Sequence, residues 1–550
     1  ELIVKGIQYP SKLLKFRSRM VFYMLRISNI KLNVDFEPSQ ELAILEKKIE
    51  KILKVKKGII KSFRISRKSI DAREKNNVQL VYSVDVEVNN ESLYSHIKNV
   101  AVVKPMEKVI HKTTTISRPI IVGSGPAGLF CALVLAEHGL NPIVVEQGLD
   151  ADRRKAAVEN FWKNGILDTN TNVQFGEGGA GTFSDGKLTT GIKNLRIPKV
   201  LKEFIEAGAP GEIAYLAKPH IGTDILITVV KNIRKKIEQL GGEVRFETKM
   251  KELIIENSTV RGVVLEKHGI IETVETDAVV LAIGHSARET FYMLKDAGVE
   301  MIPKPFAVGV RVEHSQKDID LQQFGSCACS PLLGAAEYKL NAHLANRRGV
   351  YTFCMCPGGY VVAAASEKNS VVTNGMSYST RSGDNANSAV LVSITPNDYN
   401  NDILGAIEFQ RRLERKAFEV GGSNYFAPVQ LVGDFLEDRP SKQLGDIVPT
   451  YTPGVTPTDL RECLDDFIVD SLKEGIRAMD RKLNGFMRHD AVLSAVESRS
   501  SSPVTIKRNP ITFESNIKGL YPCGEGAGYA GGITSSGVDG IKCAEAILTN

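Results

Sequence analysis

The fold is decided by the stretch Pro119-Ile-Ile-Val-Gly-Ser-Gly-Pro-Ala-Gly128, which precedes an apolar helical pattern and then Ile143-Val-Val-Glu146. Residues 120–122 are apolar, as a buried parallel strand requires. Gly123, Gly125 and Gly128 have the spacing G-x-G-x-x-G. The first permits a tight turn, the second lets the backbone approach a pyrophosphate, and the third lets the next helix pack close to the sheet. A helix over about 127–138 would point its free N–H groups and partial positive charge at the phosphates.

The remainder of this stretch completes a βαβ unit. Gly139 ends the helix, and a strand over 142–145 delivers Glu146, whose carboxylate can accept hydrogen bonds from a ribose. A glycine-rich turn without a ligand is the alternative, but the strand, turn, helix, stop and terminal acid all agree with a dinucleotide site. Glu146 favours an unphosphorylated ribose, and therefore FAD or NAD over NADP.

Length and composition are those of a globular protein with several domains. The chain has 550 residues, of which 43% are hydrophobic and 24% charged, both ordinary values. No apolar run approaches the roughly 18–20 residues that span a membrane, so we expect no membrane association. The eight cysteines are sparse and show no secretory pattern, which predicts a reducing, cytoplasmic location.

The charge is uneven along the chain. Residues 1–112 hold 23 Lys and Arg against 12 Asp and Glu, so they contribute +11 to the net +6 and the remainder contributes −5. RNA binding is one interpretation of the basic part, but it lacks an interleaved aromatic platform. A solvated basic face, or one that docks the acidic remainder, is therefore favoured, and we expect no nucleic-acid partner. Residues 1–23 are either a targeting remnant or a wrongly extended reading frame; the second is favoured because Met24 begins a natural strand.

Three domains are predicted. Residues 1–110 form a small basic α+β domain, with ferredoxin-like topology as one option. Residues 115–300 and 503–550 form one discontinuous domain, because the strand over 276–285 and the segment 519–537 return to the first βαβ unit. Residues 301–502 form an inserted domain. The expected elements of the first domain are strands over 25–34, 59–70 and 78–88, helices over 39–54 and 91–98, and a linker over 100–117. In the insertion they are sheet over 306–312 and 358–366 and helices over 406–419 and 460–483.

A second glycine-rich segment, residues 173–187, follows a charged helix over 150–164. Its glycines permit positive φ and let the backbone approach a flat ligand closely. A plain flexible loop is the alternative, but the interleaved Phe175 and Phe183 favour an ordered loop. Arg154, on the charged helix, is either a pyrophosphate ligand or an ordinary surface arginine.

Three separated segments, 122–146, 279–285 and 521–540, together resemble the FAD-binding domain of the glutathione-reductase superfamily, in its branch with an inserted substrate domain. The resemblance implies an α/β fold (α+β overall) with a Rossmann-type FAD-binding domain and an inserted mixed β-sheet and helix domain. It also implies that Glu525 lies on the ribityl and phosphate side of the flavin. The helix N-terminus near Gly532, Ile533 and Thr534 would then meet the pyrimidine end of the isoalloxazine.

More closely, the chain resembles the NAD(FAD)-utilising dehydrogenases of bacteria and plastids. The motifs are FGEGGAGTFSDGKL (175–188), FAVGVRVEH (306–314), FCMCPGGYVVAAASE (353–367), VESRSSSPV (496–504) and CGEGAGYAGGITSS (523–536). The resemblance as a whole covers residues 24 to 550, and that family has no settled substrate. The pair Cys327-Ala-Cys329 departs from its pattern.

The predicted FAD-binding residues come from all of these segments. They are Gly123, Ser124, Gly125, Pro126, Ala127, Gly128, Glu146, Gln147, Arg154, Gly178, Gly179, Ala180, Gly181, Met250, Ala282, Gly284, His285, Gly524, Glu525, Gly532, Ile533 and Thr534.

Candidate catalytic residues lie in the insertion. Two C-x-C pairs, Cys327 with Cys329 and Cys354 with Cys356, could together hold zinc or an iron–sulfur cluster, although we expect no metal. Alternatively, Cys354 or Cys356 lines the flavin pocket, or the cysteines are plain buried ones. Tyr378 and Arg381 are a candidate acid and anion-binding group, or belong to a polar connecting loop. Glu497 and Arg499 are expected at the domain junction. His285 and His314 could transfer protons but are more simply structural.

The sequence therefore predicts an FAD-dependent oxidoreductase that passes hydride between flavin N5 and an organic substrate. No C-x-x-C or C-x4-C motif lies near the glycine-rich loop, which disfavours a disulfide reductase of the glutathione-reductase type. Because no second βαβ unit with the G-x-G-x-x-G spacing is present, NAD(P)H would bind transiently or a redox partner protein would supply electrons. The alternatives are a flavin monooxygenase and a non-enzymatic electron-transfer or RNA-associated flavoprotein.

Overall fold

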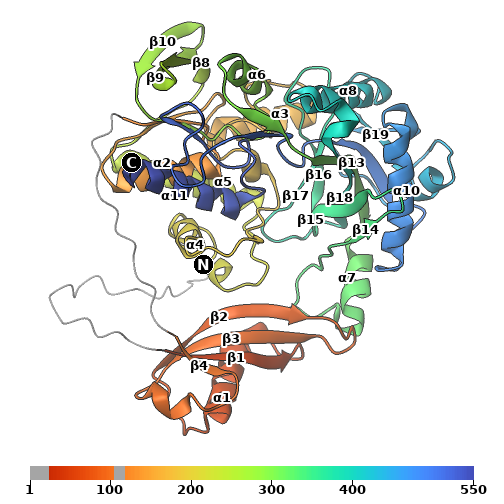
Figure 1. Cartoon of the computed structure of the whole chain (residues 1–550). Coiled ribbons are helices and arrows are strands. Elements are labelled where there is room, and N and C mark those ends of the chain that lie inside the picture. The colour runs from red at the N-terminus through yellow and green to blue at the C-terminus, as the bar shows by residue number, and fades with distance from the viewer. Residues whose placement is uncertain (1–23, 104–117, 550) are drawn as a thin grey trace. The chain divides into compact units, whose positions relative to one another are not determined.

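The structure is a computed structural model that describes residues 24–103 and 118–549 (Figure 1). The question of how residues 1–23 arose lies outside this range. The chain divides into two compact units: the small one holds residues 24–32, 36–68 and 81–103 of the described chain, and the large one holds the rest. Both units combine helices with sheets, which confirms the predicted mixed α/β fold class.

The small unit is a four-stranded sheet with one helix. Its elements are β1 (Met24–Asn33), α1 (Glu41–Leu53), β2 (Ser62–Asp71), β3 (Gln79–Glu87), the 3-10 turn η2 (Glu91–Tyr94) and β4 (Val100–Val103), and the strand order is β2-β3-β1-β4. The order agrees with the ferredoxin-like option, in which a βαβ unit is followed by a second one, with η2 in place of the second helix. The linker prediction was wrong at its start, because the four residues Val100–Val103 pair antiparallel with β1. An edge strand of four residues is too short to show the alternation of apolar and polar residues by which strands are recognised in a sequence.

A five-stranded parallel sheet forms the centre of the large unit. Its order is β23-β11-β5-β6-β7, and the bounds are β5 (Ile120–Val122), β6 (Ile143–Val145), β7 (Glu243–Arg245), β11 (Val279–Leu281) and β23 (Leu520–Pro522). β11 pairs in parallel with both β5 and β23. The segments around residues 122, 281 and 522 therefore end side by side at one edge of the sheet, as the sequence predicted.

Alternate residues of these strands face two different apolar layers. Ile121, Val144 and Val280 pack among the helices α2 (Pro126–Glu137), α4 (Ile197–Glu206), α5 (Thr223–Gln239) and α11 (Ile533–Thr549). Ile120 and Ile143 instead pack with the antiparallel sheet of β8 (Lys249–Glu256), β9 (Thr259–Lys267) and β10 (Ile270–Glu275), and with α6 (Arg288–Asp296). Both faces are therefore covered, which explains why the strands are continuous apolar runs.

Helices α2 and α11 lie against each other, although some 400 residues separate them (Figure 1). Gly540 makes this contact possible, because a Cβ there would lie 2.1 Å from the carbonyl oxygen of Ala127. Gly128 likewise has no room for a Cβ, which would lie 1.9 Å from the oxygen of Gly123. The start of α2 is therefore held by backbone on two sides, at the turn where a dinucleotide is expected.

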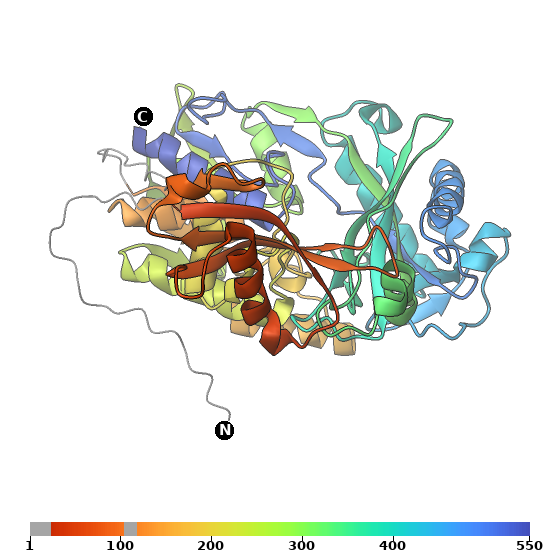
Figure 2. The same ribbon diagram turned by 90° about the horizontal axis from the view of Figure 1, so that it is seen from below.

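The insertion is built on a seven-stranded sheet of order β14-β15-β18-β13-β21-β19-β20. In both Figures 1 and 2 this sheet and its helices lie at one end of the large unit and α11 lies at the other. The strands are β13 (Phe306–Ser315), β14 (Asn341–His343), β15 (Gly349–Cys356), β18 (Asn385–Ile394), β19 (Ala427–Leu431), β20 (Val455–Pro457) and β21 (Val492–Glu497). The helices are α7 (Gln316–Phe324), α8 (Gly405–Val420), α9 (Val432–Leu436) and α10 (Asp466–Asp480).

Short elements complete the large unit. β16 (Tyr360–Ala363) pairs with β17 (Thr373–Met376), β12 (Met301–Pro303) pairs with β22 (Val504–Ile506), and α3 (Ala151–Asn164) follows β6. The helices predicted over 150–164 and 406–419 are confirmed. The one predicted over 460–483 is shorter, because its first residues form the 3-10 turn η7 (Leu460–Glu462) and α10 runs only from Asp466 to Asp480. The domain boundaries near 301 and 502 stay predictions.

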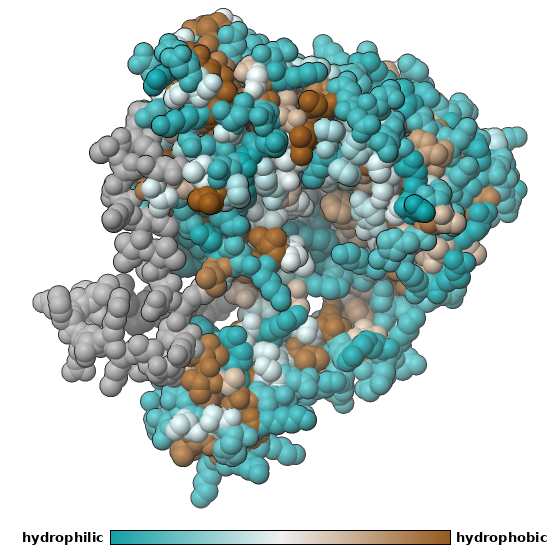
Figure 3. Space-filling view, in the orientation of Figure 1, coloured by the Kyte–Doolittle hydropathy of each residue, from teal (hydrophilic) through white to brown (hydrophobic). Residues whose placement is uncertain are grey.

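The face of the large unit in Figure 3 is mostly hydrophilic, with apolar side chains in small separate groups. Scattered apolar residues of this kind are normal on folded proteins. Within residues 24–103 and 118–549, none of the helices has the length and apolar character needed to span a membrane.

Candidate functional site

A cavity of about 350 Å³ lies in the large unit where the central sheet meets the insertion. The turn after β5, the ends of β6 and β11, the glycine-rich loop, the start of α11 and three segments of the insertion all line it. Of the predicted FAD-binding residues, those that line it are Gly123, Ser124, Gly125, Pro126, Ala127, Glu146, Gln147, Gly179, Ala180, Gly181, Met250, Ala282, Gly284, His285, Glu525, Gly532 and Ile533.

Glycines give this cavity the shape that a dinucleotide needs. Gly123 has φ +103°, and a Cβ there would lie 2.4 Å from the Ala282 oxygen, so the turn admits only glycine. At Gly125 the nearest atom to a Cβ is the Gly179 Cα at 3.8 Å, and at Gly531 and Gly532 nothing lies within 4 Å. The missing side chains of these three residues thus leave open space along one wall, and the residues present fit an extended dinucleotide.

Glu146 ties the turn to the glycine-rich loop. Its Oε2 accepts hydrogen bonds from the backbone N–H (3.1 Å) and hydroxyl (2.8 Å) of Ser124, and its Oε1 accepts from the N–H groups of Gly148 and Gly176, both at 3.0 Å. The side chain is buried and faces the cavity. With about four acceptor sites on a carboxylate, these donors hold it in a fixed orientation.

Arg154 holds the glycine-rich loop in place through hydrogen bonds to its backbone. It is fully buried, and its guanidinium donates to the carbonyl oxygens of Asn172, Val173, Gly176, Glu177 and Gly179 at 2.7–3.2 Å. Burial lowers its pKa to about 10, so it stays charged at neutral pH. Because it does not line the cavity, both sequence interpretations of Arg154 need correction: it is neither a surface arginine nor placed to meet a pyrophosphate.

Four other predicted FAD ligands lie just outside the cavity. Gly128 is inside the turn, Gly178 is pressed against Thr182 and Val230, and Gly524 lies against the Cβ of Ala127. The Thr534 hydroxyl donates to the Leu188 oxygen at 2.8 Å. These residues shape the walls through close packing, and sequence spacing alone does not distinguish that role from direct contact.

A buried ionic network joins the insertion to the central sheet. Glu414 of α8 accepts hydrogen bonds from Arg288 and Arg499 at 2.8–3.1 Å and from the Ser498 hydroxyl at 2.7 Å. Arg288 and Arg499, despite burial, keep the pKa of Glu414 far below its usual range. Arg499 also donates to Ser286 and Ser366, so it lines the cavity with its donors already engaged.

Glu497 also lines the cavity and, like Arg499, is engaged in a buried ion pair. It forms a two-pronged ion pair with the fully buried Arg311 (2.7 and 2.9 Å) and accepts from the Thr373 hydroxyl at 3.2 Å. Of the catalytic candidates, Glu497 and Arg499 therefore reach the cavity, but both hold neighbouring groups in place.

Tyr378 and Arg381 do not line the cavity, so the interpretation of their segment as a pocket wall was wrong for these two residues. Arg381 pairs with the buried Asp185, and Tyr378 is 44% exposed and stacks edge-on with Tyr360. The residues around them lead into β18, so only Asn374 of this segment reaches the cavity.

Of the two candidate histidines, one lines the cavity and the other does not. His285 lines the cavity, and burial, with Arg499 and Arg288 nearby, lowers its pKa to about 3, so it is neutral. His314 is buried elsewhere against the carbonyl oxygen of Phe486 at 2.8 Å.

Lys187 is the functional residue that the sequence reasoning missed. It lines the cavity beside Cys354, and its Nζ donates to Asp185 and to the Met355 oxygen. The signal was the pair of charges in Ser184-Asp-Gly-Lys187, which is unusual inside a glycine-rich loop. Cys354 also lines the cavity, whereas Cys356 is buried behind it.

Glu525 also lines the cavity, in the neighbourhood of Lys304 and Cys354. Burial raises its pKa to about 7, with Lys304 acting in the opposite direction and Cys354 in the same direction. At neutral pH a large share of Glu525 is therefore protonated and able to donate a hydrogen bond.

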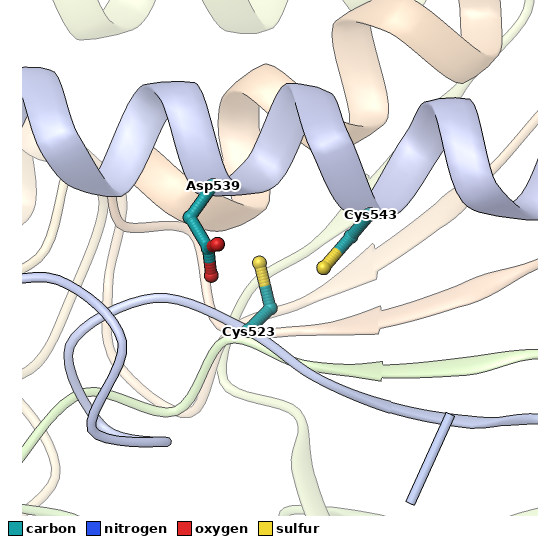
Figure 4. Close-up of side chains that lie close together, drawn as sticks. All are labelled: Cys523, Asp539 and Cys543. Atoms are coloured by element: carbon teal, nitrogen blue, oxygen red, sulfur yellow. The ribbon is translucent and has the colours of Figure 1, made fainter. Parts of the chain in front are cut away.

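Cys523, which follows β23, lies close to Asp539 and Cys543 on the facing side of α11 (Figure 4). Asp539 already accepts two hydrogen bonds from Arg508 (2.7 and 2.9 Å) and one from Gly524 N–H at 2.8 Å. Hydrogen bonding to Cys543 and burial raise the pKa of the Cys523 thiol. Asp539 thus holds Arg508 and the Gly524 turn in place, which gives the cluster a structural role.

Comparison with known proteins identifies the family and the cofactor. Residues 24–87 match a domain of unknown function, residues 118–153 an FAD binding domain, and residues 305–500 the description "FAD-dependent protein, C-terminal domain-like". An uncharacterised protein of Clostridium beijerinckii is 49% identical over 532 residues, 95% of this chain and 98% of that protein. The chain belongs to the family of that protein. Since an FAD-binding domain matches at the glycine turn itself, FAD is its cofactor.

More distant similarities exist. A digeranylgeranylglycerophospholipid reductase of Methanocella arvoryzae is 28% identical over 169 residues, 30% of this chain and 38% of that protein. Among solved structures, the flavin-dependent brominase Bmp2 aligns over 79% of each chain, at 13% identity and a TM-score of 0.37. At this score the alignment supports no inference about activity.

The role of Arg154 can be tested by replacing it with lysine. The ammonium of R154K can donate at most three hydrogen bonds and lacks the guanidinium's planar fork, so buried carbonyls lose partners. We expect a loss of about 2–3 kcal/mol in the free energy of unfolding, measured by urea denaturation and the fluorescence of Trp162, the single tryptophan. The matched control is R153K, at a half-exposed neighbour that should lose well under about 1 kcal/mol. Equal losses in the two variants would contradict this role.

Proposed function

We propose that the protein is an FAD-dependent oxidoreductase of the cytoplasm that passes hydride between N5 of the isoalloxazine and a small organic substrate. The observation that best supports this is a single cavity lined both by the dinucleotide turn and by Lys187, Cys354 and Asn374. FAD, when bound, supplies the hydride acceptor or donor. The chain's own residues bind it, exclude water and hold protons near it.

The turn and Glu146 would bind the adenosine half. The free N–H groups in the first turn of α2, after Pro126, would point at the pyrophosphate, and Gly125 would leave room for it. Three of the four donors to Glu146 are backbone groups, and the fourth is the Ser124 hydroxyl. We infer that a ribose hydroxyl takes the place of this hydroxyl, because a hydroxyl can rotate away whereas backbone N–H groups cannot.

The start of α11 and Glu525 would bind the flavin half. Gly531 and Gly532 leave space at the N-terminus of α11, whose partial positive charge favours negative charge on the pyrimidine end of a reduced flavin. Glu525, with its pKa near 7, would donate to or accept from the ribityl hydroxyls.

Lys187 would orient the substrate. Asp185 and Met355 take two of its three N–H groups, which leaves one for an oxygen of the substrate, with the Asn374 amide beside it in the cavity wall. This favours a substrate with a carbonyl or carboxylate oxygen. NAD(P)H as a transient reductant, or a redox partner protein, would complete the cycle.

Gly125 provides a test of the cofactor site. An alanine there meets only the Gly179 Cα at 3.8 Å, so we expect G125A to keep the free energy of unfolding of the apoprotein. Its methyl group would occupy the space of the pyrophosphate, and FAD affinity should fall at least tenfold, about 1.4 kcal/mol, by equilibrium titration. The control is G191A, in a loop where nothing lies within 4 Å of a Cβ. Unchanged FAD affinity in G125A would refute this placement of the pyrophosphate.

Anaerobic reduction tests the reaction class. Holoenzyme mixed with NADH or NADPH without oxygen should lose the visible absorbance of oxidised flavin, and the absorbance should return only slowly when air is admitted. Rapid return with incorporation of oxygen into an added substrate would instead indicate a monooxygenase. Failure of every nicotinamide nucleotide to reduce the flavin would leave a protein partner as the electron source and contradict the nicotinamide part of the proposal.

A further inference from the structure

A bulge of β15 at the cavity wall contains Cys354 and ends at Cys356, which pairs with Asn387 of β18. The pairing of β15 with β18 shifts between Phe353 and Cys356, so Cys354 and Met355 lie in a break of the ladder. Cys354 has φ +44°, in the left-handed region that non-glycine residues rarely occupy. Bulges next to functional sites re-aim a side chain, and here Cys354 lines the cavity while Cys356 lies fully buried behind it.

Three donors hold this bulge. Arg311 Nη1 and the Cys356 thiol each donate to the Cys354 carbonyl oxygen at 3.2 Å, and Lys187 Nζ donates to the next carbonyl, that of Met355. Arg311 is itself fixed by Glu497 and by Asn387, whose amide oxygen accepts at 2.8 Å. Two cations from different parts of the chain therefore converge on two consecutive peptide groups and keep the unusual backbone in place.

The two sulfurs are unlike each other. A hydrogen bond from Cys356, with Lys187 and Arg311 nearby, lowers the pKa of Cys354 to about 6 in spite of its burial. Hydrogen bonding to Cys354 and burial raise the pKa of Cys356 well above its usual value. At neutral pH the low pKa makes Cys354 a thiolate at the cavity wall, while the Cys356 thiol two residues on stays protonated and donates to the Cys354 carbonyl oxygen. An ionised cysteine near a protonated one is the arrangement that thiol–disulfide chemistry uses.

We propose that Cys354 and Cys356 form a redox-active pair that exchanges two electrons with FAD bound in the cavity. On oxidation, a Cys354–Cys356 disulfide bond forms, the Cys354 thiolate and the Cys356 thiol together give up two electrons and one proton, and FAD takes up both electrons and that proton to become the anionic reduced flavin FADH−. The reverse reaction breaks the disulfide. The protein would thus store two electron pairs, one on the flavin and one on the sulfurs. This inference rests on the flavin placement of the proposed function.

The second C-x-C pair, Cys327 and Cys329, is removed from the protein that is used for the test. Cys327 and Cys329 have the same spacing, but Cys327 is half-buried and Cys329 is exposed, and neither lines the cavity. The parent for the test is therefore C327S/C329S holoenzyme, in which exposed thiols cannot oxidise and confuse the count. C354S and C356S are added to this parent one at a time, so that failure of one variant to fold does not end the test.

The measurement is the number of electrons that each holoenzyme accepts. Each protein is reduced, allowed to reoxidise in air and titrated anaerobically with dithionite. The parent should take four electrons per FAD, two for the flavin and two for the disulfide, whereas C354S and C356S should take two. A parent that takes only two electrons overturns the inference while leaving FAD binding intact. A parent that holds no FAD contradicts the proposed function instead.

Mass spectrometry gives an independent readout. In air-oxidised parent, the peptide that contains both cysteines should lack two hydrogens and resist iodoacetamide. In the same protein stripped of FAD and exposed to air, that peptide should stay alkylatable, because its electron acceptor is missing. A peptide that stays fully alkylatable in the air-oxidised holoenzyme would also overturn the inference.

Discussion

The close approach of backbone to backbone at the glycine turn is the constraint on which the large unit depends. A Cβ at Gly123 would collide with the end of β11, one at Gly128 with the turn itself, and one at Gly540 with the start of α2. Gly526 similarly lies against Gly284, with 2.4 Å between its Cβ position and that oxygen. Three segments far apart in the chain can therefore converge on one point only because none of them has a side chain there, and the cavity begins at that point.

The charged groups around the cavity depend on this convergence in turn. Arg154 holds the glycine-rich loop against the turn, Glu146 joins the two, and Glu414 with its arginines holds the insertion against β11. Buried charges of this kind are costly unless fully paired, so each network specifies one arrangement of the segments it joins. The result is a cavity with glycine walls for a cofactor at one end and a lysine, a thiol and an amide at the other.

Much of this architecture could be predicted from the sequence, and the remainder could not for identifiable reasons. The βαβ unit, the returning strands and Glu146 follow from local patterns of glycine spacing and apolar runs. The place of Arg154 does not, because its five acceptors lie on a loop 18–25 residues away whose path no local pattern specifies. Tyr378 and Arg381 were misjudged because a polar segment gives no sign of which side faces a cavity. Lys187 and Cys354 meet across 167 residues, and only the fold brings them together.

The central claim is that FAD lies extended along the glycine wall, with its ribose at Glu146 and its isoalloxazine beside Gly532 and Cys354. A crystal structure of the holoenzyme tests it most directly. The account predicts density for the pyrophosphate at the N-terminus of α2 and for the flavin ring in the cavity, in van der Waals contact with Cys354. Density for FAD in another orientation, or a flavin ring separated from Cys354 by protein, would contradict the account.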